Sequence, residues 1–200
     1  MLIGLSVSAI VLVVGTLSGI VSGYFSYADS IIMRIMDALM AVPSIMLALA
    51  LMAIFGAGIR NVIIALAITF IPALSRIARG STLAVREESF VESARASGAG
   101  NSRIIFRHLL PNILSPIIVH VTITFALTLV TEAALSFLGV GVPPEIPSWG
   151  SIIADGRDYM VRAPWLIIAP GVAIVLTVLS VNMIGDAIRD LVDPALRGVD

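Results

Sequence analysis

The sequence predicts an all-α integral membrane protein that forms a single domain over residues 1–200 and crosses the membrane five times. Hydrophobic residues make up 58% of the chain and charged residues only 12%, whereas about a quarter of the residues in a soluble domain are charged. Five stretches carry no charged residue, namely 2–28, 38–59, 61–75, 109–131 and 163–185. A bilayer core needs about 20 apolar residues per helix, so four of them can span it. The stretch 61–75 reaches that length if Arg76 and Arg79 extend to the interface.

The first predicted helix, 2–25, carries a stripe of small residues. Gly15, Gly19 and Gly23 recur at four-residue spacing, and such a stripe allows another helix to approach closely. The sequence supports two interpretations equally, packing inside this chain and contact with a partner subunit. A short linker of mixed charge, 26–37, is expected to follow.

The second and third predicted helices each contain a proline. Pro43 lies in the helix 38–57 and Pro72 in the helix 61–80. Proline removes a backbone hydrogen bond and usually kinks a helix. Kinked helices occur both around transport pathways and in inert bundles, so both interpretations stay open.

The last two predicted helices are separated by a polar external segment. The fourth helix, 111–137, begins with a proline, which suits the first turn of a helix. The segment 139–164 is polar enough to lie outside the hydrocarbon, and we expect a short interfacial helix with Trp149 and Tyr159 as anchors. The fifth helix is expected over 165–186.

One acidic residue, Glu132, lies inside a predicted span away from its ends. It follows Pro111 by 21 residues, which is about 30 Å of helix and places it near the external interface. An acidic residue in a membrane helix is a functional candidate. Three roles remain open for Glu132: a substrate gate, a helix-end hydrogen bond, or an ion pair with Arg157 or Arg162.

The distribution of arginine predicts the orientation. If the loops alternate sides, nine of the twelve basic residues, all of them arginine, share the side of the central loop 84–110. By the positive-inside rule this side is cytoplasmic. The N-terminus is then outside and the C-terminus inside. The nine are Arg34, the six arginines from Arg76 to Arg107, Arg189 and Arg197, against Arg60, Arg157 and Arg162.

Several chemistries are not expected of this chain. It contains no lysine, which a P-loop needs to reach the phosphates of ATP, and no cysteine, which excludes thiolate metal sites and disulfides. His108 and His120 have no nearby carboxylate in the sequence to complete a metal site. A net charge of −1 offers no general attraction to nucleic acid. We therefore expect neither an enzyme nor a bound cofactor.

The central loop 84–110 is the long polar segment of the chain. We expect a short helix over 88–97, because Glu87 and Glu88 suit the positive end of a helix dipole and Gly98 suits a C-terminal cap. Phe90 could anchor this helix in a groove of another protein, and Glu92 could pair with Arg95. Its small residues leave one thin face: Ser93, Ala94, Ala96 and Ser97. A docking helix and a solvated loop without a partner are equally supported by these residues.

The same loop resembles the EAA loop of permeases from binding-protein-dependent ABC transporters. Their pattern is Glu-Ala-Ala, three residues, Gly, nine residues, Ile, any residue and Leu-Pro. In this chain Glu92-Ser93-Ala94, Gly98 and Leu110-Pro111 match it. Ser93 replaces the first alanine and His108 replaces the isoleucine.

Other segments narrow the resemblance to dipeptide, oligopeptide and nickel permeases, most closely their second or "C" subunit. These segments are Thr131–Gly139, Pro143–Gly150 and Asn182–Pro194, and the resemblance covers essentially all 200 residues. Members usually begin with one more transmembrane helix, so the chain is expected to lack the first of six helices, through truncation or a late start.

This resemblance implies a type I ABC importer transmembrane-domain fold in the cell inner membrane. It implies two separate ATP-binding subunits that hold ATP and Mg, a second permease subunit in a heterodimer, and an external solute-binding protein near 139–164. Gly15, Gly19 and Gly23 would then contact the second permease. Peptides, nickel and other small solutes all fit the family. The residues implied to couple the chain to the ATPases are Glu88, Phe90, Glu92, Ser93, Ala94, Ser97, Gly98, Leu110 and Pro111.

Two other classes remain open. One is a stand-alone carrier coupled to ions or protons through Glu132, and the other is a structural membrane subunit without a transport role. The carrier is disfavoured because only one carboxylate lies within the predicted spans away from their ends and no inverted repeat is evident.

Overall fold

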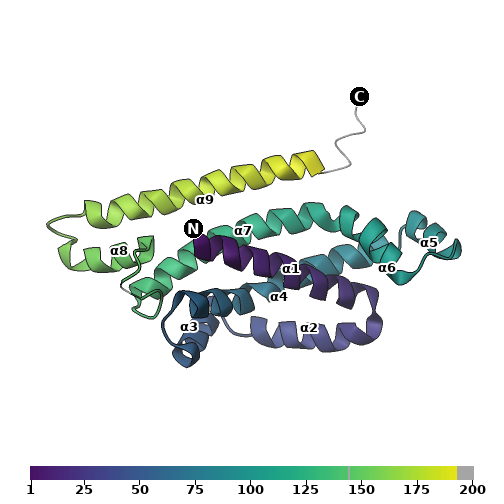
Figure 1. Ribbon diagram of the computed structural model, residues 1–200, viewed down its shortest axis with the longest axis horizontal. Helices are drawn as coiled ribbons and strands as arrows, with labels where there is room; N and C mark the ends of the chain where they lie inside the picture. The colour runs from purple at the N-terminus through teal and green to yellow at the C-terminus, as the bar shows by residue number, and fades with distance from the viewer. Residues whose placement is uncertain (144, 193–200) are drawn as a thin grey trace.

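The computed structural model describes residues 1–143 and 145–192, with side chains through residue 188, and the regular elements of this part are all helical (Figure 1). In chain order the elements are α1 (Leu2–Tyr24), α2 (Ser26–Met40), α3 (Ser44–Phe55), α4 (Ile59–Arg86), α5 (Ser89–Ala96), α6 (Asn101–Arg103), the π-helical segment η1 (Ile104–Leu109), α7 (Leu110–Phe137), α8 (Trp149–Gly156), the short 3-10 turn η2 (Arg157–Tyr159) and α9 (Trp165–Val192).

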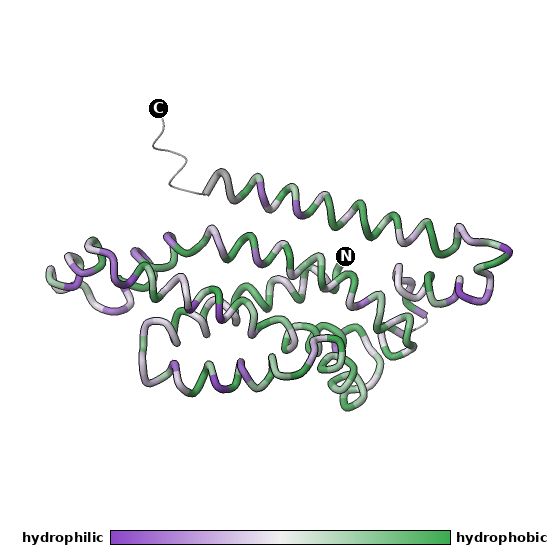
Figure 2. The backbone as a smooth tube through the Cα atoms, turned by 180° about the vertical axis from the view of Figure 1, so that it is seen from behind, coloured by the Kyte–Doolittle hydropathy of each residue, from purple (hydrophilic) through white to green (hydrophobic). Residues whose placement is uncertain are grey.

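The predicted all-α membrane fold is confirmed. Within the described residues, four helices are long and apolar enough to cross a membrane: α1, α4, the continuous helix Asn101–Phe137 and α9. A fifth crossing results only if α2 and α3, which meet at 92°, count as one broken span. Hydrophobic residues cover the middle of the long helices, and hydrophilic residues gather mainly at the two ends of the bundle and along α2 (Figure 2).

The core lies between α1, α4 and α7. Its central side chains come from all three helices and are fully buried, among them Val7 and Val11 of α1, Leu66 and Leu74 of α4, and Ile113 of α7. Close helix packing replaces the hydrophobic effect as the source of stability inside a bilayer. α9 contacts α7 and α8, and Gly185 lies directly against Thr122.

The expected linker 26–37 and the expected second helix 38–57 are both wrong. Residues 26–40 form α2, which runs back along α1 and α4, and the chain then turns by 92° into α3. Pro43 ends the helix rather than kinking it, because it lacks an N–H and disfavours helical geometry at the preceding residue. Arg34 therefore lies in a helix and not in a loop, but the predicted arginine majority on one side of the membrane does not depend on Arg34.

The predicted start of the fourth helix at Pro111 is confirmed for α7, which begins at Leu110 with Pro111 in its first turn. The structure adds the helical segments α6 and η1 ahead of α7 without a break, so that a longer continuous helix results. This longer helix begins at Asn101 and runs for 37 residues, which is about 55 Å and exceeds the bilayer core of about 30 Å. The π-helical turns before Pro111 widen the helix, and the N–H of Leu110 bonds to the carbonyl of Ile105. Such a bulge accommodates the proline within a continuous helix. The first turns of this helix therefore extend beyond the hydrocarbon.

The predicted end of the fourth helix at Phe137 is confirmed, and the short helix expected between the last two long helices forms as α8. Gly139 has φ +78°, and the N–H of Val140 reaches the carbonyl of Leu135 at 3.0 Å. In the external segment, Ser148 caps α8 by accepting from the Ser151 N–H at 3.1 Å. The third and fifth helices extend past their predicted ends, to Arg86 and Val192. Outside the description lie Pro144, Asp193, Pro194, Arg197 and the side chains of Arg189 and Asp190.

Candidate functional site

The predicted short helix of the central loop forms as α5, with Glu88 as its N-cap residue. Gly98 follows its C-terminus with φ +83°. Its N–H bonds to the carbonyl of Arg95 and the N–H of Ala99 to that of Ala94, each at 3.0 Å. This pair of bonds is a Schellman cap, so the predicted cap at Gly98 is confirmed.

α5 is fixed to the bundle through its inner face. Val91 is fully buried against Ile104 and Leu109 of the helix that follows, and Tyr24 and Val85 pack on the same cluster. The hydroxyl of Tyr24 also donates to Asn101 Oδ1 at 2.9 Å. The ends of α1 and α4 and the start of the helix Asn101–Phe137 therefore meet beneath α5.

The outer face of α5 is free to contact another protein. Exposed residues include Glu92, Ser93 and Ser97, and Phe90 is 42% exposed with its ring 6.2 Å from that of His108. The expected Glu92–Arg95 pair is not among the ion pairs formed by the described residues. Two members of the predicted coupling set lie apart from α5: Leu110 and Pro111 are in the first turn of α7.

A basic hollow lies at the base of α5 and was not predicted. A cavity of about 230 Å³ is lined by Arg103, Arg107 and His108 together with Ala94, Ser97 and Ala99. Neither arginine forms an ion pair with a described residue. Arg103 and Arg107 are four residues apart, which places them on one face of a helix. This spacing predicts a basic surface only if the helix begins before Pro111.

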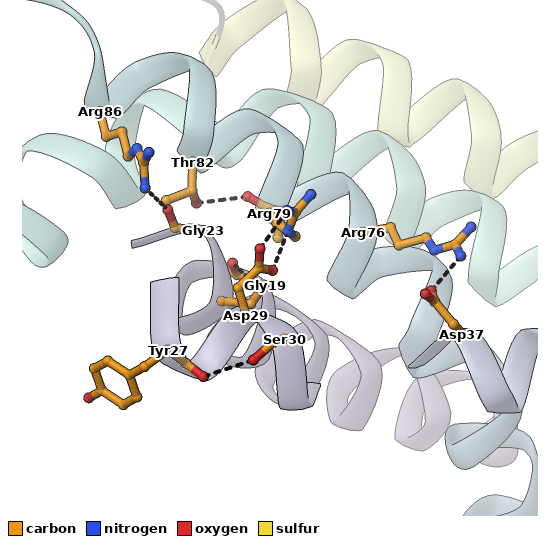
Figure 3. Close-up of polar contacts among 12 residues, drawn as sticks. Gly19, Gly23, Tyr27, Asp29, Ser30, Asp37, Arg76, Arg79, Thr82 and Arg86 are labelled. Atoms are coloured by element: carbon orange, nitrogen blue, oxygen red, sulfur yellow. Dashed lines mark hydrogen bonds and ion pairs between the residues drawn. The ribbon is translucent and has the colours of Figure 1, made fainter. Parts of the chain in front are cut away.

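The glycine stripe of α1 packs inside this chain. A Cβ added to Gly15 would lie 3.0 Å from Leu74, one added to Gly19 2.5 Å from Ala78, and one added to Gly23 2.7 Å from Thr82. Figure 3 shows Gly19 and Gly23 facing α4. Of the two interpretations left open by the sequence, the structure supports packing against α4 of the same chain.

Ion pairs fasten α2 to α4, and the sequence reasoning missed them (Figure 3). Arg79 donates to both carboxylate oxygens of Asp29, at 2.5 and 2.6 Å, and Arg76 donates to Asp37 at 2.5 Å. Arg86 donates to the carbonyl of Gly23 at 2.8 Å. Asp29 and Asp37 are eight residues apart, about two helical turns. This spacing is the sequence signal that both carboxylates lie on one face of a helix. The mixed charge of residues 26–37 favours a linker and hides this pattern.

Breaking the Arg79–Asp29 pair is expected to loosen α2 from α4. A double-mutant cycle of Arg79→Gln and Asp29→Asn should give a coupling energy of about 1–2 kcal/mol, because two charge-assisted hydrogen bonds are lost together. The side chains of this pair are 33% and 27% exposed. The Arg76–Asp37 pair, 49% and 57% exposed, should give less than about 1 kcal/mol. Reversible unfolding in detergent measures both cycles, and equal coupling energies would contradict the expectation.

Glu132 lies at the external end of α7, beside α8. It is 7% exposed, and Ser136 Oγ donates to its Oε1 at 2.8 Å. Among the described residues it forms no ion pair with Arg157 or Arg162, and the Arg157 guanidinium lies 5.8 Å from the ring centre of Phe137. Of the three roles left open, the helix-end hydrogen bond is observed, while a gating role stays a prediction.

A cavity of about 450 Å³ adjoins Glu132 at this end of the bundle. Its walls come from the start of α1, from α7, and from the segment between Val142 and Ile152. Within residues 1–143 and 145–188, no three His, Asp or Glu side chains lie together as a metal site would require.

Comparisons with known proteins agree with this architecture. A family model described as binding-protein-dependent transport system inner membrane component matches residues 12–198. The dipeptide transport system permease protein DppC of Alkalihalophilus pseudofirmus is 44% identical over 187 residues, and the glutathione transport system permease protein GsiD of Pectobacterium atrosepticum is 46% identical over 187 residues. Each alignment covers 93% of this chain and 62% of the relative. The chain also spans 66% of the length of a Brucella suis protein that it matches.

A solved structure supports the fold. A chain of the inward-facing MetNI methionine ABC transporter superimposes with a TM-score of 0.75 at 22% identity, covering 96% of this chain and 90% of that one. This likeness confirms the type I ABC importer permease fold. With the match over residues 12–198, it leads to one conclusion: the chain belongs to the family of binding-protein-dependent transport system inner membrane components and is a multi-pass inner-membrane protein.

Proposed function

We propose that this chain is a permease subunit of an ATP-driven importer and forms part of a membrane pathway for peptides or a related small solute. The proposal is supported by its family, by the transporter fold of its helices, and by relatives that are named dipeptide and glutathione transport permeases. The chain itself does not hydrolyse ATP in this proposal. Two separate ATP-binding subunits hold ATP and Mg.

The observation that carries the coupling role is the placement of α5. It lies at one end of the molecule, beyond the bundle of long helices (Figure 1), with Val91 anchored in the cluster that joins α1, α4 and the helix Asn101–Phe137. Its outer face, which includes Glu92 and Ser97, is exposed. A partner that moves α5 would therefore move the ends of three membrane helices together. Direct attachment of this kind suits the transmission of an ATP-driven movement.

The other partners belong to the same proposal. A second permease subunit completes the pathway as a heterodimer, and an external solute-binding protein delivers the substrate at the end of the bundle that carries α8. Because the glycine stripe is already occupied by α4, the second permease contacts a different surface of this chain.

A single cysteine at position 97 tests the coupling role. Ser97 is exposed and directly precedes Gly98 at the C-terminal end of α5. The natural chain contains no cysteine, so an introduced cysteine is the single thiol. When Ser97→Cys is co-expressed with candidate ATP-binding subunits carrying their own single cysteines, we expect a crosslink whose yield changes on adding ATP. Tyr159→Cys, exposed at the opposite end, is the control and should give none. If the inserted protein has an accessible thiol at position 97 but crosslinks to no ATPase, the carrier that uses Glu132 becomes the better hypothesis.

A further inference from the structure

The carboxylate of Glu132 is only partly satisfied by the protein. Ser136 donates to Oε1. Among the described residues no hydrogen bond to Oε2 is found, and Oε2 is not one of the fully buried oxygens without a partner, so it keeps access to the cavity that Glu132 lines. None of the ion pairs among described residues involves Glu132, although the residue is only 7% exposed. Burying a charge without a partner is costly, and acidic residues inside membrane proteins commonly mark a substrate or ion site. The unused oxygen therefore calls for a ligand that donates hydrogen bonds and carries positive charge.

The cavity beside Glu132 has the size and lining of a small-molecule site. Its volume of about 450 Å³ lies within the usual range of roughly 300–1,000 Å³. Most of its lining is apolar, with Leu2, Leu129 and Ile146 as examples. Thr128, one helical turn before Glu132, also lines it, but its hydroxyl already donates to the carbonyl of Thr124 at 2.7 Å. Glu132 is thus the one acidic side chain in an otherwise largely apolar wall.

The lining selects among cations. A divalent metal ion prefers several oxygen ligands, and the described residues do not gather three acidic or histidine side chains anywhere. A primary ammonium group needs less: one carboxylate can accept from it, and an aromatic face can stabilise it further. Trp149 lines the same cavity. The apolar remainder of the wall suits a small solute whose other end is hydrophobic.

We propose that this external cavity binds a primary ammonium group, with Glu132 as its counter-ion, and that the group is the amino terminus of a short peptide. The proposal deepens the proposed function, on which it rests, because it names the part of the substrate that the permease recognises. The same chemistry is present in the headgroup of phosphatidylethanolamine, so the test must separate a peptide from a lipid.

A thiol reporter in the cavity wall measures the local charge. Ile152 lines the cavity and is 39% exposed, so Ile152→Cys can be modified in right-side-out membrane vesicles by a cationic and by an anionic methanethiosulfonate. Glu132→Gln keeps the size of the side chain and an acceptor for Ser136. Because this variant removes a nearby negative charge, the ratio of the modification rate with the cationic reagent to that with the anionic reagent should fall about tenfold. Glu132→Asp should keep most of the ratio. At Val161→Cys, which is 96% exposed and outside the cavity lining, the ratio should not change.

Peptide protection then identifies the ligand. Alanyl-alanine should slow the modification of Ile152→Cys, whereas N-acetyl-alanyl-alanine should not, and Glu132→Gln should remove the difference. A ratio that is unaffected by Glu132→Gln, or equal protection by both peptides, overturns the proposal. A lowered ratio without protection by either peptide overturns the peptide assignment, and slower modification in vesicles that contain phosphatidylethanolamine than in vesicles without it then assigns the ammonium to membrane lipid. The assay needs no ATPase, so its failure is distinguishable from failure of the crosslink at Ser97.

Discussion

Gly98→Glu is expected to lower ATP-driven uptake by about tenfold or more, which corresponds to at least about 1.4 kcal/mol, while the protein still inserts normally. Gly98 has φ +83°, and a residue with a Cβ is strained there by roughly 1–2 kcal/mol. No described atom lies within 4 Å of a Cβ at this position, so the side chain meets no obstacle inside the chain. The strain and the added carboxylate instead act on the cap of α5 and on the surface offered to the ATPase.

Two control variants separate these causes. Gly100 lies two residues further along the same loop, also has open space around its Cβ, and has φ −70°, which any residue adopts. Gly100→Glu should therefore keep near-normal uptake. Gly98→Asn should retain much of the activity, because asparagine tolerates the left-handed region. Uptake driven by the reconstituted transporter, together with the amount of inserted protein, measures all three. Normal uptake by Gly98→Glu would contradict the coupling role of α5.

Gly19→Ala should destabilise the protein by about 3 kcal/mol, at the upper end of the range for overpacking a core. The added Cβ would lie 2.5 Å from the Ala78 Cβ, 2.6 Å from the Ser75 carbonyl oxygen and 2.9 Å from the Arg79 nitrogen. Two of these are backbone atoms of α4 and cannot rotate away, so α1 and α4 must separate. The separation also displaces Arg79, which holds α2 through Asp29.

Gly80→Ala is the matched control for this prediction. Gly80 lies in α4, as a glycine within a long helix like Gly19, but no described atom lies within 4 Å of its added Cβ. Alanine is also the better helix former, by about 0.5–1 kcal/mol, so this variant should be neutral or slightly stabilised. Unfolding in detergent, followed for both variants and the unaltered protein, gives the comparison. If Gly19→Ala is as stable as Gly80→Ala, the glycine stripe does not set the distance between α1 and α4.

The predictions for Gly98 and Gly19 concern different parts of one set of packed helices. α4 runs from the external end at Ile59 to Arg86, directly before α5, and the helix Asn101–Phe137 runs back from α5 to the external cavity. In the proposed function, these two helices connect the docking surface at one end with Glu132 at the other. A loss of uptake with normal stability is expected at Gly98, and a loss of stability is expected at Gly19.

Features that depend on neighbouring residues can be predicted from the sequence of this protein. Long uncharged runs indicate membrane helices because every backbone polar group in a bilayer must bond within its own helix. The arginine count indicates orientation, and the cap at Gly98 follows from the freedom of glycine to adopt positive φ. The spacing around Glu92 and Gly98 was enough to indicate the family that the match over residues 12–198 then established.

Features that depend on residues far apart in the chain are visible only in the folded protein. Asp29 and Asp37 favoured a linker over residues 26–37, because their partners on α4 are 50 and 39 positions away. The glycine stripe has the same sequence whether it meets α4 or another subunit, and the long helix beginning at Asn101 needs the cluster around Val91 to hold it. Likewise, the cavity at Glu132 forms only because the starts of α1 and α4, the end of α7, the segment before α8 and α8 itself converge there. Local patterns specify helices and caps, but which polar group is paired and which stays available depends on what the fold brings beside it.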